Sequence, residues 1–264
     1  MNVIILFLSY IGRIFILLAH ELGSTFLFFL TGFLNIFTYP FQFKKIIQQV
    51  YFIGAKSFFV IVFIGLFTGM VLGLQGYYAL SMVGSEGFLG SGIALSLIRE
   101  LGPALGSIMV IGRAGSSMAA EIGIMRITEQ IDALYTMDIN PVKYLFSPRI
   151  VASLISFPIL ISLFDIVGIF GGYLTGVVLL GVDPGSFISR MITMVKMDDI
   201  LGGYYKAFIF GALVVTICCY QGYFVHTRKE GFGARGVSFA TTSAVVISCV
   251  TVLVADYVIT SLLV

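Results

Sequence analysis

The sequence predicts an all-α integral membrane protein, and two observations support this class. Hydrophobic residues make up 59% of the 264 residues and charged residues only 11%, whereas an ordinary soluble domain is about 25% charged. The mean hydropathy of +1.07 reflects a series of apolar runs, each long enough for a bilayer crossing of about 20 residues. Together with their linkers, these runs account for nearly all of the residues. We therefore expect residues 1–264 to form a single membrane domain.

The first 50 residues are expected to form an N-terminal interfacial or elbow segment (1–50). Residues 3–37 are apolar enough to cross a bilayer, but Arg13, His20 and Glu21 interrupt them. Two arrangements fit this pattern. The segment either spans the membrane or lies in the headgroup layer as an amphipathic helix. The basic cluster that follows marks a cytoplasmic side: Lys44, Lys45 and Lys56.

A core of five transmembrane helices is expected over residues 57–263. The predicted spans are 57–81, 89–112, 149–180, 201–225 and 237–263. Most loop lysines and arginines lie in two islands, 113–149 and His226–Arg235. The positive-inside rule places both islands in the cytoplasm, and it places the loop at 182–200 and the C-terminus outside.

Glycines four positions apart recur in three of the predicted spans. They are Gly65, Gly69 and Gly73, then Gly102 and Gly106, then Gly168, Gly172 and Gly176. Small residues at this spacing let helix backbones approach closely in lipid, although glycine is common in membrane helices and one pair alone has little weight. The repetition predicts a compact bundle and favours a homodimer.

The island between the second and third spans is expected to contain a cytoplasmic coupling helix over residues 116–139. Apolar residues recur there at spacings of three and four: Ile124, Ile127, Ile131 and Leu134. Ser116 and Ser117 are expected to cap its start, and Asn140-Pro141 to end it. A transport protein driven from the cytoplasm needs such an element to receive force from its motor. A solvated connecting helix without a partner is the alternative.

Two adjacent charges, Arg99 and Glu100, lie inside the second span. Each charge at bilayer depth costs about 2.5–3.5 kcal/mol on insertion scales. Neighbours on a helix diverge by about 100°, so at least one of the two should face another helix or a watery cavity. We expect either a structural ion pair between helices or a polar patch that meets the headgroup of a translocated lipid. Gln75, Tyr77 and Tyr78 are candidates to line the same cavity, although interfacial anchoring explains the tyrosines equally well.

Two further carboxylates lie within predicted spans, Asp165 and Asp256. Their cost at that depth suggests inward-facing partners, and packing or hydrogen bonding is the favoured role. A proton relay would need a second ionisable group near each. The two histidines, His20 and His226, both lie at predicted interfaces and supply no such group.

Several of these motifs, in this order, resemble those of one transporter family. They are RELGP (99–103), GRAGS (112–116), AEIG (120–123) and EQIDAL (129–134), within a strongly similar stretch from about residue 65 to 152. The chain resembles the permease subunits of MlaE/YrbE type, the membrane component of ABC transporters that move lipids between membranes. It departs from the family pattern at Phe239 and Ser243, where basic residues are usual.

The resemblance implies a homodimeric, multi-pass permease of the bacterial inner membrane that carries phospholipid. It implies a separate ATPase, which binds ATP and Mg, an MCE-domain partner in the periplasm and often a small STAS-type cytoplasmic protein. Arg99 and Glu100 match the family's RE positions beside an outward-facing lipid cavity. The expected contacts with the ATPase lie in the coupling helix: Glu121, Arg126, Glu129 and Asp132.

The sequence also limits the alternatives. It contains no GxxxxGK[ST] motif, so we expect ATP hydrolysis to come from another chain and this chain to be non-catalytic, without a cofactor or metal of its own. A hydrolase would need a nucleophile and a base together, and no such pair is apparent. A net charge of +2 gives no reason to expect a nucleic-acid partner. The nearer rival is a proton-coupled secondary transporter that uses Asp165 or Asp256.

Overall fold

The computed structural model describes residues 3–37, 42–227 and 233–263, and every regular element within these ranges is a helix. In this described part of the chain, five helical segments are long and apolar enough to cross a membrane. They are Phe43–Ser81, Glu86–Ile127, Pro141–Leu179, Met197–Tyr223 and Gly233–Leu263. The predicted all-α membrane class and the five spans are therefore confirmed.

Each span consists of one or more labelled helices. In chain order these are α2 (Phe43–Ile53) and α3 (Phe58–Ser81); α4 (Leu89–Ser96), α5 (Gly102–Val110) and α6 (Ser116–Ile127); α8 (Pro141–Tyr173); α10 (Met197–Tyr223); and α11 (Gly233–Leu263). The other helices are α1 (Val3–Leu34), α7 (Gln130–Thr136) and α9 (Pro184–Met194), which are not among these five segments. Short 3-10 turns are η1 (Asn35–Phe37), η2 (Ala55–Ser57), η3 (Glu86–Phe88) and η7 (Val225–Thr227), and π-helical turns are η4 (Leu97–Leu101), η5 (Ile111–Gly115) and η6 (Leu174–Leu179).

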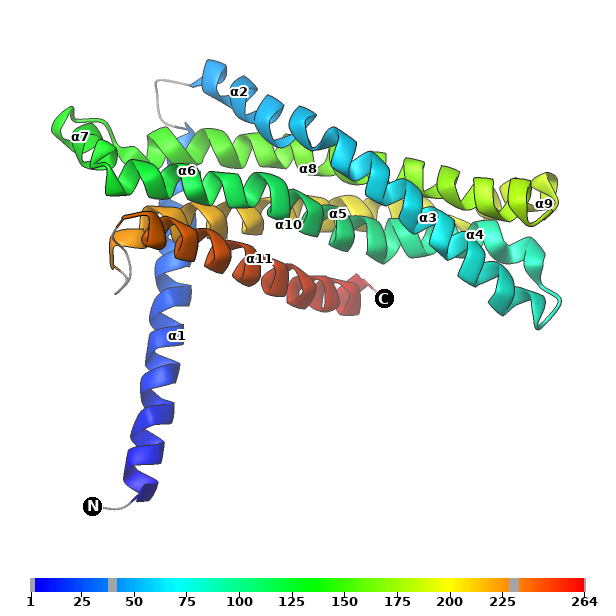
Figure 1. Cartoon of the computed structure of the whole chain (residues 1–264), viewed down its shortest axis with the longest axis horizontal. Coiled ribbons are helices and arrows are strands. Elements are labelled where there is room, and N and C mark those ends of the chain that lie inside the picture. Colours follow the sequence, from blue (N-terminus) through cyan, green and yellow to red (C-terminus); the bar gives the residue numbers. More distant parts are fainter. Residues whose placement is uncertain (1–2, 38–41, 228–232, 264) are drawn as a thin grey trace.

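The spans run side by side along one axis, with α7 at one end of the bundle and α9 at the other (Figure 1). This arrangement agrees with the prediction that the island containing α7 and the loop containing α9 lie on opposite sides of the membrane. Part of the second predicted basic island, Arg228 to Glu230, lies outside the described residues.

Glycines let α3 and α8 pack at backbone distance. A Cβ added to Gly69 would overlap the carbonyl of Gly168, and one added to Gly73 would lie 3.1 Å from the Gly172 carbonyl oxygen. The predicted close packing of small residues is therefore confirmed, but it joins two helices of the same chain. These glycines consequently give no support to the predicted homodimer.

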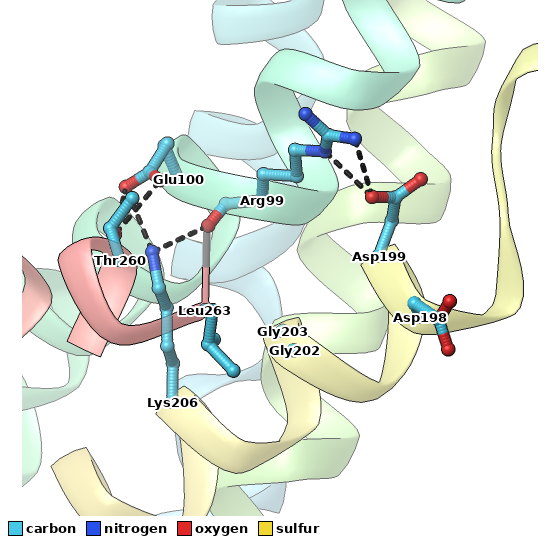
Figure 2. Close-up of a pocket in the computed structure, with 9 residues that line it drawn as sticks. All are labelled: Arg99, Glu100, Asp198, Asp199, Gly202, Gly203, Lys206, Thr260 and Leu263. Carbon is cyan, nitrogen blue, oxygen red and sulfur yellow. Dashed lines mark hydrogen bonds and ion pairs between the residues drawn. The ribbon is translucent and has the colours of Figure 1, made fainter.

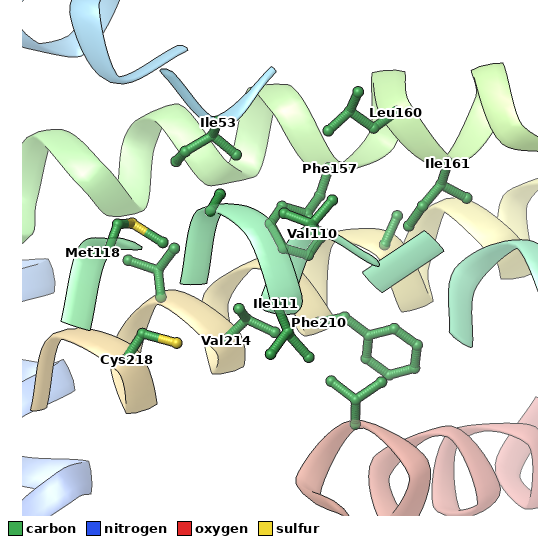
Figure 3. Packing of buried hydrophobic residues seen from close by; sticks show 14 of the residues in the cluster. Ile53, Val110, Ile111, Met118, Phe157, Leu160, Ile161, Phe210, Val214 and Cys218 are labelled. Carbon is green, nitrogen blue, oxygen red and sulfur yellow. The ribbon is translucent and has the colours of Figure 1, made fainter. Parts of the chain in front are cut away.

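The core lies between the second, third and fourth spans. Large apolar side chains from α5, α6, α8 and α10 interdigitate there (Figure 3), and Phe157, Phe210 and Met118 are fully buried. Such burial fixes the relative positions of these helices, because a core packed at crystal-like density tolerates little displacement. The π-helical turn η4 directly precedes α5, which belongs to this core.

The single helix predicted over 116–139 is wrong. α6 continues the second span without a break, and the serines expected to cap its start instead bond back to carbonyls of the preceding turn: Ser116 to Gly112 and Ser117 to Arg113. The helix ends at Ile127, and Glu129 takes a left-handed conformation with φ of 58° before α7 begins. The helical spacing of the apolar residues is present, but these residues belong to two helices. Ile124 and Ile127 lie at the end of α6, and Ile131 and Leu134 lie in α7.

Asn140 also has a different role from the predicted one. Its side chain accepts hydrogen bonds from the backbone N–H groups of Val142 and Lys143, at 3.0 and 3.3 Å. Asn140 is therefore the N-cap of α8, and Pro141 occupies the first helical position, where its missing N–H costs nothing. The chain turns from α7 into the third span within four residues, 137–140.

α1 runs across the bundle, whereas the spans run along it (Figure 1). The C-terminal part of α1 contacts the bundle. There Phe28 packs edge-on against Phe146, with ring centroids 5.0 Å apart. Ser147 Oγ donates a hydrogen bond to the Gly32 carbonyl at 2.9 Å. These contacts fix α1 at the end of the bundle near α7.

Candidate functional site

A cavity of about 300 Å³ opens between η4, the start of α10 and the end of α11. Figure 2 shows its lining side chains, which are mostly charged. They are Arg99, Glu100, Asp198, Asp199, Gly202, Gly203, Lys206, Thr260 and Leu263. We call this the charged cavity.

Arg99 and Glu100 point in different directions from η4 (Figure 2). Arg99 binds Asp199 at the start of α10, with Nη2 2.6 Å and Nε 2.7 Å from the same carboxylate oxygen. The Arg99 side chain is 51% exposed and that of Asp199 only 9%. Arg99 therefore faces the open part of the cavity, and part of its guanidinium is accessible to a ligand.

Glu100 belongs to a more enclosed cluster around Lys206, whose side chain is only 2% exposed. The Lys206 ammonium lies 2.8 Å from Glu100 Oε2 and 2.8 Å from Asp256 Oδ1. Thr260 Oγ1 donates to Glu100 Oε1 at 3.0 Å. We call Glu100, Lys206 and Asp256 the carboxylate–lysine triad, and it joins the second, fourth and fifth spans.

A proline explains the third contact of Lys206. Its ammonium donates to the Arg99 carbonyl at 2.7 Å. In a regular α-helix that carbonyl would accept from the residue four positions on, which here is Pro103, and proline has no N–H. Lys206 thus satisfies a backbone acceptor that the sequence leaves open.

The structure separates the five residues that were predicted to share a cavity. Arg99 and Glu100 line one cavity, and each forms an ion pair with another helix, as the structural alternative predicted. Contact with a lipid headgroup stays a prediction. Gln75, Tyr77 and Tyr78 do not line this cavity. They lie near the end of α3, where Tyr77 packs against the core and Tyr78 is exposed.

Lys206 lines the charged cavity but was not predicted from the sequence as a site residue. It is a single cation inside the apolar run GGYYKAFIFGALVV, and its cost in a membrane should have marked it in the same way as Arg99. Asp256 has an inward-facing partner, as expected, but the contact is an ion pair with Lys206 rather than packing or a neutral hydrogen bond. Asp165 differs, because it forms no ion pair within the described residues and its buried Oδ1 has no hydrogen-bond partner there.

At the other end of the bundle, three of the four predicted coupling residues, Glu121, Arg126 and Asp132, form ion pairs within the chain. Glu121 forms an ion pair of 2.8 Å with Arg149, whose side chain is only 4% exposed. Arg126 forms an ion pair of 2.7 Å with Asp132 and so ties α6 to α7. Arg149, predicted as part of a solvated island, is therefore a buried contact between α6 and α8.

Arg126 also contacts the turn after α10. Its Nε donates to His226 Nδ1 at 2.9 Å. Partial burial of the imidazole, and then the nearby Arg126 guanidinium, lower the pKa of His226. Tyr135 of α7 and Tyr223 of α10 add a second contact, with their hydroxyl oxygens 2.8 Å apart. These contacts hold α7 against the bundle.

Part of the exposed surface at this end combines acidic and large apolar side chains. Glu129 and the carboxylate of Asp132 face solvent, as do the large side chains of Tyr135 and Met137, which are 57% and 67% exposed. We call these four residues the α7 surface. It combines acidic and apolar groups on a helix fixed to two membrane spans.

Residues 46–262 of the chain match the sequence model of a protein family described as Permease MlaE. The chain belongs to the MlaE permease family. It is 42% identical over 223 residues to the intermembrane phospholipid transport system permease protein MlaE of Haemophilus influenzae, covering 84% of each chain. It is 41% identical over 252 residues to a probable ABC transporter permease protein of Rickettsia bellii, covering 96% of this chain and 95% of that one.

A more distant relative of this MlaE-family chain comes from a plant. The chloroplastic protein TRIGALACTOSYLDIACYLGLYCEROL 1 of Arabidopsis thaliana is 34% identical over 218 residues, covering 83% of this chain and 61% of that protein. The match to the MlaE family includes the α7 surface and every residue of the charged cavity except Leu263. The resemblance stated from the RELGP and EQIDAL motifs is therefore confirmed.

Proposed function

We propose that this chain is the permease subunit of an ABC transporter that moves phospholipid between the bacterial inner membrane and a periplasmic MCE-domain partner. A separate ATPase, which binds ATP and Mg, supplies the energy. The observation that carries the proposal is the charged cavity set into membrane-spanning helices. Buried charge of both signs is costly at that depth and suits a phospholipid headgroup better than an apolar solute. The name of the Haemophilus influenzae relative supports the choice of substrate.

The position of α1 allows the depth of the cavity to be worked out. We place α1 in the cytoplasmic interface, because it crosses the bundle and packs through Phe28 against Tyr220 of α10. At about 1.5 Å per residue, Lys206 lies about 21 Å beyond Tyr220 and Asp199 about 32 Å beyond it. The hydrocarbon core is about 30 Å thick. Arg99 and Asp199 therefore lie near the outer headgroups, and the triad lies deeper.

This depth suggests how a lipid is held. A headgroup phosphate competes with Asp199 for the half-exposed Arg99, since arginine binds phosphate and carboxylate oxygens in the same bidentate manner. Exchange of one anion for the other frees the start of α10 from η4. The carboxylate–lysine triad stays closed during this exchange and keeps the three helices together.

The α7 surface is the proposed contact with the ATPase. The ion pairs Glu121–Arg149 and Arg126–Asp132 connect α6 and α7 to the third span. A push on α7 therefore passes directly into the second and third spans, and the second span carries η4. The coupling function predicted for the 116–139 interval is retained on the shorter α7.

The proposed assembly is a homodimer, accompanied in some systems by a small STAS-type cytoplasmic protein. The first and fifth spans bury the smallest shares of their apolar windows in one chain, 28% and 11%. Their exposed faces leave room for a second copy as well as for lipid. The glycines of α3 do not supply this contact, because α8 of the same chain already packs against them.

Charge reversal at the α7 surface tests the coupling step. Glu129→Lys should abolish ATP-dependent lipid transfer in vesicles that contain the permease with its ATPase, because it reverses an exposed charge at the contact. Glu86→Lys makes the same change at the opposite end of the bundle and should leave ATPase binding intact. Normal transfer by Glu129→Lys would remove α7 from the coupling path.

Lipid crosslinking tests the cavity separately. Arg99→Ala should reduce the yield of crosslinks between a photoreactive phospholipid headgroup and residues of α10, while the protein remains folded and bound to the ATPase. Unchanged crosslinking would exclude Arg99 from the lipid site.

A further inference from the structure

A second cavity, of about 180 Å³, lies beside the charged cavity and has a different chemistry. It is enclosed by η4, α8 and the start of α10. Isoleucines supply most of its wall: Ile98, Ile161, Ile166, Ile169 and Ile200. Ser162, Asp165, Gly203 and Tyr204 complete it, and Gly203 lines both cavities. We call it the isoleucine cavity.

The two cavities are neighbours because adjacent residues of the same two helices face opposite sides. Ile98 precedes Arg99 on η4, and Ile200 follows Asp199 on α10. Successive residues of a helix point about 100° apart, so one side of this helix contact is ionic and the other is apolar. Gly203 keeps the contact narrow, since a Cβ there would lie 2.7 Å from the Ile98 carbonyl oxygen.

One polar group in the isoleucine cavity lacks a partner. Asp165 Oδ1 is buried and has no hydrogen bond within the described part of the chain. It lies against Gly102, where any Cβ would overlap it. Buried polar atoms in folded proteins are nearly always hydrogen-bonded. Because Asp165 also lines the cavity, a ligand bound there can supply the missing hydrogen bond.

We propose that the isoleucine cavity binds one acyl chain of a membrane lipid, with a polar group of the lipid's glycerol region hydrogen-bonded to Asp165. The wall chemistry matches a hydrocarbon chain, and the cavity opens toward the bilayer beside Ile166, which is 67% exposed. Its volume is below the roughly 300–1,000 Å³ of sites that enclose a whole ligand. It therefore has room for part of a lipid only.

The depth of Asp165 agrees with this ligand. Ser147 contacts α1, and Asp165 lies 18 positions further along α8, a rise of about 27 Å. With α1 in the cytoplasmic interface, that level is near the outer boundary of a hydrocarbon core about 30 Å thick, where glycerol esters and hydroxyls begin. The site goes beyond the proposed function, because binding here requires neither ATP nor transport.

The test uses a phospholipid with a photoreactive diazirine in its acyl chain, in vesicles of phosphatidylethanolamine and phosphatidylglycerol that contain the full chain. Ile166→Trp fills the cavity, and Ile159→Trp is its matched control. Ile159 is also exposed, at 62%, and lies two helical turns away on the same face of α8 without lining the cavity. We expect lipid adducts within residues 161–169 or 200–204 to fall at least five-fold in Ile166→Trp and to persist in Ile159→Trp.

A second pair of variants tests the hydrogen bond. Asp165→Asn keeps a polar group of the same size and should retain the adduct, whereas Asp165→Leu should lose it. The inference is overturned if the wild-type chain gives no lipid adduct at these residues, if Ile166→Trp gives as much as Ile159→Trp, or if the crosslinks join another protein instead. None of these outcomes depends on Arg99 or the ATPase, so failure here is distinct from failure of the transport proposal.

Discussion

Replacing Lys206 with methionine removes the centre of the carboxylate–lysine triad while keeping much of the side chain's volume. Lys206 is 2% exposed and contacts two carboxylates at 2.8 Å. Removing one partner of a buried ion pair typically costs about 3–5 kcal/mol, because the remaining charge stays desolvated. The Glu100 side chain is 41% exposed, so water relieves its share, whereas Asp256 is only 15% exposed. We therefore expect a loss at the lower end of that range, about 3 kcal/mol.

Equilibrium unfolding in detergent micelles measures this loss. Lys44→Met, the same change at an exposed lysine of α2, should alter the free energy of unfolding by less than about 0.5 kcal/mol. Adding Asp256→Asn to Lys206→Met should recover part of the loss, since one unpaired buried charge disappears. A loss below about 1 kcal/mol for Lys206→Met, or no recovery in the double variant, would refute the account of the triad.

Three other predictions follow from the remaining contacts. Gly69→Val should destabilise the protein by about 2–3 kcal/mol in the same unfolding assay, because its side chain would overlap the α8 backbone; Gly92→Val, which meets open space, should have little effect. The folded state disfavours protonation of His226, so its contribution to stability is complete above the unfolded pKa of about 6.5 and declines as the pH falls below it. The protection factors of α7 amides, corrected for the slower intrinsic exchange at lower pH, should accordingly fall between pH 7.5 and 5.5, and His226→Gln should remove this dependence. Glu129→Gly should stabilise α7 modestly, since glycine adopts the left-handed backbone at φ of 58° without strain; slower thermal unfolding checks it, and no change would show that the turn is unstrained.

Hydropathy, charge and motif order predicted the class, the five spans and the family, because these properties depend on many residues together. Spacing alone could not locate the end of the second span. Ile124, Ile127 and Ile131 keep a helical period across the break. The residue with the left-handed backbone at the break is Glu129 and not a glycine, so the sequence gives no sign of it. The glycine spacing predicted close helix packing correctly, but whether the partner was α8 or a second chain depended on the tertiary arrangement.

The charged cavity was predicted in the same partial way. Arg99 and Glu100 were identified because charge is costly in a bilayer, and the same argument applied to Lys206 would have completed the triad. The ion pair between Glu100 and Lys206 could not be predicted from the sequence, because the two residues are 106 positions apart and meet only when two spans pack together. Arg99 pairs with Asp199 rather than with its neighbour for the same reason.

The proposed function requires that energy delivered at the α7 surface moves phospholipid at the charged cavity. The most direct measurement is transfer of a labelled phospholipid out of vesicles that contain the permease, its ATPase and the MCE-domain acceptor, with ATP and the proton gradient varied independently. We expect transfer to require hydrolysable ATP and to continue when the proton gradient is collapsed. Transfer that stops with the gradient and ignores both ATP and the ATPase would contradict the claim and would favour a proton-coupled carrier that uses Asp165 or Asp256.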